Sequence, residues 1–155
     1  MRLIKSILGC MVASALCGCV TGGSANKTAL ELQSFQRQEF ETTKKIAFAS
    51  TLSVFQDMGY IIKTADIETG LISASSPTQN MVFFGSTMKN TEASAFIEEM
   101  SPNKTFVRLN FVAVVEQSSG YGMKGKSDKP IMDAKTYQNC FQKIQEGIFL
   151  RTNSQ

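Results

Sequence analysis

The sequence predicts an α+β domain, an antiparallel sheet of about five strands with two helices packed on one face. Two segments carry apolar residues at helical spacing, residues 43–58 and the segment that follows Asp133. Between them, shorter segments alternate apolar and polar residues, as strands with one buried face do. Turns that contain Gly or Pro separate these segments, which indicates that neighbouring strands pair as antiparallel hairpins.

The N-terminal region has the layout of a secretory signal peptide. Arg2 and Lys5 precede an apolar run over residues 7–16, and the small residue Gly18 stands immediately before Cys19. The apolar run is too short to cross a bilayer, because a membrane-spanning helix needs about 20 residues.

Leu16-Cys17-Gly18-Cys19 resembles the lipobox of bacterial lipoproteins, which has an aliphatic residue, a loosely constrained residue, Gly or Ala, and then cysteine. The resemblance implies that a signal peptidase recognises Leu16 and Gly18 and cleaves after Gly18. It also implies that Cys19 is diacylated on its thiol and usually acylated on its new amine. A second match at residues 7–10 leaves too little apolar sequence before it to serve as the hydrophobic core of a signal peptide.

Lipidation would fix where the protein lies in the cell. Two or three acyl chains anchor a protein stably, whereas a single chain binds a membrane marginally. Val20 follows the lipid cysteine, at a position where Asp in many lipoproteins signals retention in the inner membrane. The resemblance therefore implies an outer-membrane location, on the periplasmic face rather than the cell surface, with the membrane as a partner through the lipid on Cys19.

The mature chain is expected to consist of a tether and one domain. Residues 19–33 include Gly22 and Gly23 and show little apolar periodicity, so we expect a flexible tether with a reach of roughly 20 Å. Residues 34–155 are expected to form a single α+β domain that begins with a strand at residues 34–41.

The clearest helical signal covers residues 43–58. Thr42 or Thr43 is suited to cap its N-terminus, and Gly59 is suited to the left-handed conformation that ends a helix. A hairpin is expected next, with a tight turn ending at Gly70 and strands at residues 60–65 and 71–75.

The helix and hairpin carry a second resemblance, over residues 40–74, with Asp133 and Tyr137 also in place. Val54-Phe55-Gln56-Asp57-Met58-Gly59-Tyr60 and Gly70-Leu71-Ile72-Ser73-Ala74 are similar to a pattern in small α+β bacterial lipoproteins. The same segment is distantly similar to the helix-grip domains of a lipoprotein subunit of the β-barrel assembly machinery. These residues form a helix stop and a hairpin turn, so the resemblance informs the fold more than the function.

The second half of the chain predicts three more elements. Strands are expected at residues 92–100 and 105–116, joined by a turn that contains Pro102, and the second of these has the clearest alternation in the sequence. A loop without periodicity is expected over residues 118–130. Asp133 then caps a helix whose apolar stripe contains Tyr137, Cys140, Phe141, Ile144 and Ile148.

Residues 77–90 are expected to form a long connection that contains the apolar run Met81-Val82-Phe83-Phe84. One interpretation is that this run caps the core or forms a short strand. The other is that Met81, Phe83 and Phe84 are exposed anchors for a partner or the membrane, since aromatic side chains often dominate binding. Phe96, Val112 and Val114 are expected on the uncovered face of the sheet, where they favour a partner or a covering loop.

The composition excludes several classes of function. Without Arg2 and Lys5 the mature chain has 14 basic and 13 acidic residues, and it has no basic run of the kind that binds nucleic acid. The absence of histidine excludes a Ser-His-Asp site, a Cys-His site and a histidine metal site. Glu98 and Glu99 are adjacent in a strand and so point to opposite faces, which prevents them from acting as a catalytic pair. We therefore expect no enzymatic activity, no cofactor and no metal.

The cysteines also change on maturation. Two of the four leave with residues 1–18 and Cys19 is acylated, so Cys140 is the one that remains unmodified. It lies within the apolar stripe of the last helix, which indicates an inert buried thiol.

Three functions stay open at this point. The sequence favours an anchored interaction or assembly module that contacts another envelope protein. A periplasmic small-ligand-binding lipoprotein is the alternative, with a cleft between helices and sheet. An enzyme that uses carboxylates such as Asp128 and Asp133 is the least favoured.

Overall fold

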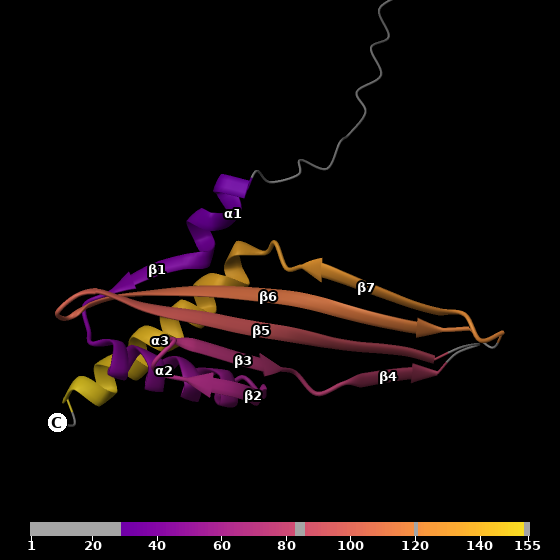
Figure 1. The fold of residues 1–155 in the computed structure, drawn as a ribbon, viewed down its shortest axis with the longest axis horizontal. Coiled ribbons are helices and arrows are strands. Elements are labelled where there is room, and N and C mark those ends of the chain that lie inside the picture. The colour runs from indigo at the N-terminus through magenta and orange to yellow at the C-terminus, as the bar shows by residue number, and fades with distance from the viewer. Residues whose placement is uncertain (1–28, 83–85, 120, 154–155) are drawn as a thin grey trace, which may run out of the picture.

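A computed structural model describes residues 29–82, 86–119 and 121–153 (Figure 1). The predicted signal peptide and the lipobox-like residues Leu16, Gly18 and Cys19 lie outside these ranges. The helices are α1 (Ala29–Gln36), α2 (Lys44–Asp57) and α3 (Ala134–Asn153). The strands are β1 (Arg37–Phe40), β2 (Ile61–Asp66), β3 (Leu71–Ser75), β4 (Gln79–Val82), β5 (Ser86–Ser101), β6 (Lys104–Ser118) and β7 (Lys124–Pro130).

All seven described strands belong to one antiparallel sheet. Its main order is β1-β6-β5-β3-β2, with β4 paired to β5 and β7 paired to β6. The α+β class and the antiparallel sheet are therefore confirmed. The expected numbers of strands and helices are wrong, because the described chain has seven strands and three helices instead of about five and two.

β4 and β7, the two strands beyond the expected five, lengthen the sheet instead of widening it. β1 pairs with residues 105–108 of β6, and β7 pairs with residues 112–118 of the same strand. On the other side, β3 pairs with residues 92–96 of β5, and β4 pairs with residues 86–89. The sheet is thus five strands wide beside the helices and four strands wide beyond them. We call the four-stranded end the arm, which comprises β4, residues 86–91 of β5, residues 112–118 of β6, the turn that follows and β7; it extends to the right in Figure 1.

The two long helices begin and end as the sequence predicts. Thr43 caps α2 through its hydroxyl, which accepts a hydrogen bond from the backbone N–H of Ile46, and Gly59 follows the helix with φ +81°. The Asp133 carboxylate caps α3 by accepting hydrogen bonds from the backbone N–H groups of Lys135 and Thr136. The predicted stripe of α3 is buried at all five of its positions, Tyr137, Cys140, Phe141, Ile144 and Ile148.

The core lies between the sheet and the helices α2 and α3. The sheet contributes the odd-numbered residues of β5 and β6, which are fully buried from Ala93 to Ile97 and from Val107 to Phe111. The Phe111 ring is central, since its centroid lies 5.1 Å from that of Tyr137 and 6.2 Å from those of Phe55 and Tyr60. α1 joins this arrangement through Phe35, whose ring centroid is 5.1 Å from that of Tyr137.

A gap in hydrogen bonding on β6 is closed by a side chain. β1 pairs with β6 as far as Arg108, and β7 begins to pair at Val112, so neither strand pairs with Phe111. The Tyr137 hydroxyl accepts a hydrogen bond from the Phe111 backbone N–H at 3.3 Å and donates one to the Ile131 carbonyl at 3.0 Å. The Phe111 carbonyl accepts from the backbone N–H of Ile131 at 2.8 Å. Tyr137 therefore supplies the polar partner that a continuous edge strand would have supplied.

Three segments differ from the prediction. Residues 29–33, expected in the tether, form most of α1, and the first strand is confined to Arg37–Phe40. The expected loop over residues 77–90 contains β4 and the start of β5, so the interpretation of this stretch as a long connection is wrong. The expected loop over residues 118–130 contains β7. Every residue of β7 is exposed, so this strand has no buried face and leaves no alternation in the sequence.

Candidate interaction surfaces

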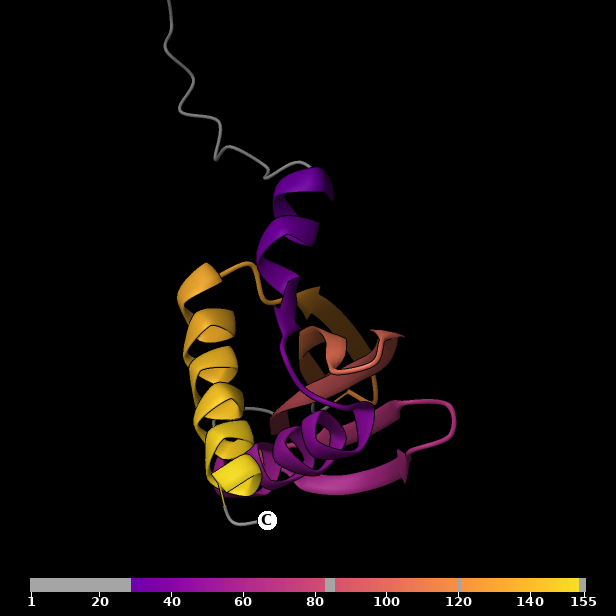
Figure 2. The same cartoon turned by 90° about the vertical axis from the view of Figure 1, so that its left-hand side faces the viewer.

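One face of the five-stranded part of the sheet carries no helix in the described chain. In Figure 2, α3 lies to the left of the strands, α2 lies below them and α1 lies above them, and no helix lies on the right-hand side of the sheet. The residues of β5 and β6 that face this side are even-numbered, because their odd-numbered neighbours point into the core. We call this side the open face.

A single row of side chains crosses the open face, one from each of five strands. Strand register places its members opposite one another in the order Asp66, Leu71, Phe96, Arg108 and Arg37. Leu71 and Phe96 are cross-strand partners that keep 49% and 37% of their surfaces exposed. An exposed apolar pair at the centre of a sheet is therefore flanked by a carboxylate on one side and two guanidinium groups on the other.

Side chains next to this row hold Arg37 in place and define the charges around it. The Arg37 guanidinium carbon lies 3.7 Å from the centroid of the Phe106 ring, a cation–π geometry that holds both groups in place. Lys104 forms an ion pair at 2.7 Å with Glu39, the residue that lies opposite Phe106 on β1. No carboxylate of the described residues forms an ion pair with Arg108. We call Leu71, Phe96, Phe106, Arg37 and Arg108 the open-face patch.

Asp66, the acidic residue at one end of the row, is hydrogen-bonded within the β2–β3 turn. Thr69 donates a side-chain hydrogen bond of 2.9 Å to the Asp66 carboxylate, and the backbone N–H of Glu68 donates another at 2.9 Å. These bonds, the Thr69 hydroxyl first, lower the pKa of Asp66 because they favour its ionised form. Asp66 is thus held in the β2–β3 turn as a carboxylate, and the other end of the row carries the two guanidinium groups of Arg108 and Arg37.

The sequence indicated only part of this surface. Phe96 lies on the open face as expected, but Val114 is buried and Val112 is half-buried. In the register of β6 and β7, Val114 lies opposite Asp128 and Val112 opposite Pro130, so both belong to the arm. The arginines and Leu71 were missed, since each looks like an ordinary solvent-facing strand position until the register brings them together.

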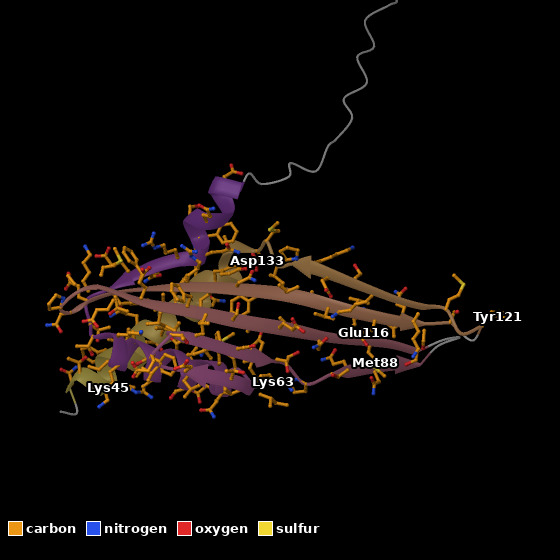
Figure 3. The ribbon with its side chains drawn as sticks, in the orientation of Figure 1. Lys45, Lys63, Met88, Glu116, Tyr121 and Asp133 are labelled. Atoms are coloured by element: carbon orange, nitrogen blue, oxygen red, sulfur yellow. The ribbon has the colours of Figure 1, made fainter. Side chains whose placement is uncertain are left out.

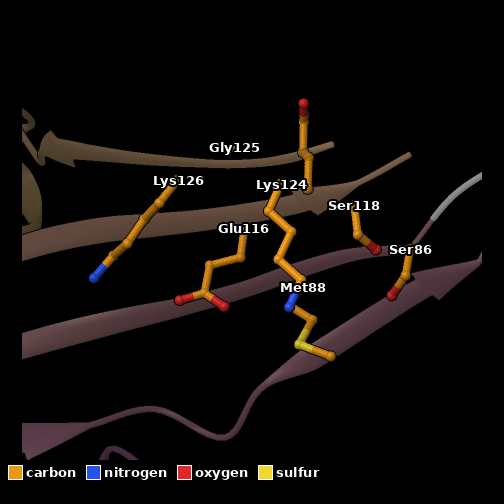
Figure 4. Close-up of a pocket in the computed structure, with 8 residues that line it drawn as sticks. Ser86, Met88, Glu116, Ser118, Lys124, Gly125 and Lys126 are labelled. Carbon is orange, nitrogen blue, oxygen red and sulfur yellow. The ribbon is translucent and has the colours of Figure 1, made fainter. Parts of the chain in front are cut away.

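The arm contains a groove of about 490 Å³ that is lined by residues of three strands (Figure 4). Ser86, Ser118 and Lys124 form one cross-strand row of its floor, and Met88, Glu116 and Lys126 form the next. Lys126 also lies 3.7 Å from Asp128 in an exposed ion pair. The groove offers one apolar side chain among solvated charges and hydroxyls, a composition suited to a weak polar contact rather than to catalysis.

The tip of the arm carries two strongly exposed apolar side chains. Tyr121 is 98% exposed and Met123 is 76% exposed, and Figure 3 shows Tyr121 at the far end of the arm, beyond Met88 and Glu116. Met81 belongs to β4, where it lies opposite Thr87, and Phe83 and Phe84 lie outside the described residues. The suggestion that Met81, Phe83 and Phe84 bind a partner therefore stays a prediction.

The described residues hold no cluster of metal-ligating side chains, and their one free cysteine is buried. No group of three or more His, Cys, Asp or Glu side chains in residues 29–82, 86–119 and 121–153 is placed to hold a metal ion. Burial raises the pKa of the Cys140 thiol to about 12, so this cysteine stays protonated and unreactive at neutral pH, in agreement with its predicted inert role.

Comparison with known proteins adds no relative, because no protein-family model and no curated protein matches the chain. Within the part of the chain that the structure describes, none of the helices is long and apolar enough to cross a membrane.

Proposed function

We propose that this protein is a lipid-anchored envelope lipoprotein that acts as an interaction or assembly module at the periplasmic face of the outer membrane. The anchor is supported by the lipobox-like residues Leu16, Gly18 and Cys19 and by the signal-peptide layout before them. The module is supported by one observation above all, the row in which Leu71 and Phe96 stand exposed beside the unpaired Arg108.

The composition of the open-face patch matches that of protein interfaces. Aromatic side chains and arginine are the residue types that most often dominate binding energy. Burying the remaining surface of Leu71 and Phe96 would contribute about 2–4 kcal/mol before the costs of association. Arg108 adds a requirement for a carboxylate, so the partner is expected to be a protein surface with apolar side chains and an acidic group.

The patch is suited to binding because its side chains point away from the core. Its three apolar members, Leu71, Phe96 and Phe106, lie outside the buried cluster. Leu71 and Phe96 keep 49% and 37% of their surfaces exposed and pack the remainder on the sheet, so removing both side chains is expected to cost about 1–3 kcal/mol of stability while it removes the centre of the interface.

The test is the double variant Leu71→Ser/Phe96→Ser, compared with Phe149→Ser/Leu150→Ser as a matched control. The control residues are also exposed and apolar, but they lie on α3. We expect both variants to stay folded at the growth temperature, the open-face variant with a somewhat lower melting temperature, and only the open-face variant to lose crosslinking to its envelope partner in intact cells. Arg108→Glu should weaken the same crosslink. Wild-type crosslinking by the open-face variant would contradict the proposal.

The anchor has a test of its own. Cys19→Ala should leave uncleaved or soluble precursor, and mass spectrometry of the wild-type membrane fraction should show acyl chains on Cys19. Mature protein with an unmodified Cys19 would refute the anchor and leave the open-face patch to be judged separately.

The alternative function, binding of a small ligand, is supported by the volume of the arm groove, which falls in the range of ligand pockets. This alternative predicts that a compound stays bound to the purified protein in native mass spectrometry. The variant Met88→Asp, which alters the groove floor, should lose that compound.

A further inference from the structure

We propose that the tip of the arm makes a second contact with the membrane, on an anionic phospholipid surface. This inference rests on the proposed lipid anchor at Cys19, and it concerns a surface different from the open-face patch. The contacting residues would be Tyr121 and Met123 at the turn, with Lys124 and Lys126 just behind them.

The turn presents its apolar side chains to solvent in a defined geometry. The backbone N–H of Ser119 donates to the Met123 carbonyl at 2.9 Å, and that of Gly122 donates to the Ser119 carbonyl at 3.0 Å. Gly122 has φ +82°, a left-handed conformation that glycine adopts without strain. Tyr121 and Met123 are the most exposed large hydrophobic side chains of the described residues. A tyrosine side chain combines an apolar ring with a hydroxyl that can stay hydrated, and this combination is suited to the membrane–water interface.

Charge distinguishes the arm from the rest of the domain. The arm holds four lysines, Lys89, Lys124, Lys126 and Lys129, against two carboxylates, Glu116 and Asp128. The other described residues hold nine basic and eleven acidic side chains, so the excess of charge changes sign along the molecule. Anionic lipid would attract the arm and repel the opposite end, which favours one orientation of an anchored domain.

The anchor brings the tip within reach of the same membrane. Nine residues, 20–28, lie between Cys19 and the start of α1 at Ala29, and the ten Cα–Cα steps from Cys19 to Ala29 span at most about 35 Å when extended. A tethered domain meets its membrane at a high effective concentration, so a contact too weak to bind in solution is sufficient. The predicted consequence is that the arm touches the bilayer while the open face stays available to a protein.

The absence of tryptophan from the sequence provides a direct assay. Tyr121→Trp places a single tryptophan at the tip, and Phe149→Trp places one at an exposed site on α3 that is 64% accessible in the wild type. Each full-length lipidated variant would be reconstituted in phosphatidylcholine vesicles with and without phosphatidylglycerol, and quenching by lipids with brominated acyl chains would be measured.

We expect quenching of the tip tryptophan to exceed that of the α3 tryptophan by about threefold or more in vesicles with phosphatidylglycerol, together with a blue-shifted emission. Adding Lys124→Glu and Lys126→Glu to Tyr121→Trp should return the signal to the α3 level. Equal quenching of the two tryptophans would overturn the inference, and so would a tip signal that appears only when envelope proteins are added, because the tip would then bind protein.

Mass spectrometry of the reconstituted chain separates this inference from the proposed function. An unmodified Cys19 contradicts the anchor and the inference together. A lipidated chain whose tip tryptophan is not quenched contradicts the inference alone.

Discussion

We predict that the Tyr137 hydroxyl contributes more to the free energy of unfolding than any other single polar atom of the core. Tyr137 is fully buried, and its hydroxyl bonds to three groups: the Phe111 N–H, the Ile131 carbonyl and, at 3.3 Å, the side-chain amide of Gln36. The variant Tyr137→Phe keeps the ring and its contacts and removes only this oxygen.

The size of the effect follows from what the oxygen satisfies. Without it, the buried Phe111 N–H and the Ile131 carbonyl lose partners that no strand replaces, and an unsatisfied buried group costs about 1–3 kcal/mol. The Ile131 carbonyl and Gln36 are part-buried and regain some hydration, so we expect a total loss of about 2–3 kcal/mol. For a domain of this size that corresponds to a fall in melting temperature of roughly 10 °C.

Urea unfolding of the full-length chain measures this directly, with Tyr121→Phe as the matched control. The control removes the same atom from a side chain that is 98% exposed, and it should leave the unfolding free energy unchanged. The exchange rate of the Phe111 amide hydrogen should rise in Tyr137→Phe. A loss of less than about 0.5 kcal/mol would refute the view that Tyr137 closes the gap between β1 and β7.

Two further predictions concern stability. Burial raises the pKa of Cys140 to about 12 from an ordinary value of 9.0, so the folded state favours the neutral thiol and loses that advantage as pH rises from about 9 towards 12. The stability difference between wild type and Cys140→Ala should therefore shrink by about 1.4 kcal/mol per pH unit in that range, and a constant difference would contradict burial. At the β2–β3 turn, Gly70 has φ +75° and a Cβ there would collide with the Ile97 carbonyl, whereas Gly59 has φ +81° and open space around it. Gly70→Ala should cost more than about 3 kcal/mol and Gly59→Ala only about 1–2 kcal/mol, as measured by urea unfolding, and equal costs would count against the collision.

The sequence predicted the elements in which burial of one face requires apolar residues at regular intervals. The stripe of α3 and the alternation of β6 each follow from one buried face, and both were predicted within a few residues of their observed ends. Asp133 and Gly59 were predictable because helix ends require particular side chains and backbone angles.

β7 was not predictable for the complementary reason. β7 is exposed throughout, and it is held by backbone pairing with β6, which leaves no trace in side-chain periodicity. The open-face patch was hidden because its members come from four strands, β1, β3, β5 and β6. Arg37 and Arg108 are 71 positions apart in the chain, and only the register of β1 and β6 places them side by side.

If the anchored domain binds an envelope protein through its open face, a photoreactive group placed on that face should capture the partner. The most direct measurement is site-specific photo-crosslinking in cells, with a photoreactive phenylalanine analogue in place of Phe96 or, for comparison, Phe149. Our account predicts a discrete crosslinked product from position 96 in the membrane fraction that disappears with Arg108→Glu and is absent from position 149. Equal products from the two positions, or none from position 96 in lipidated and folded protein, would contradict it.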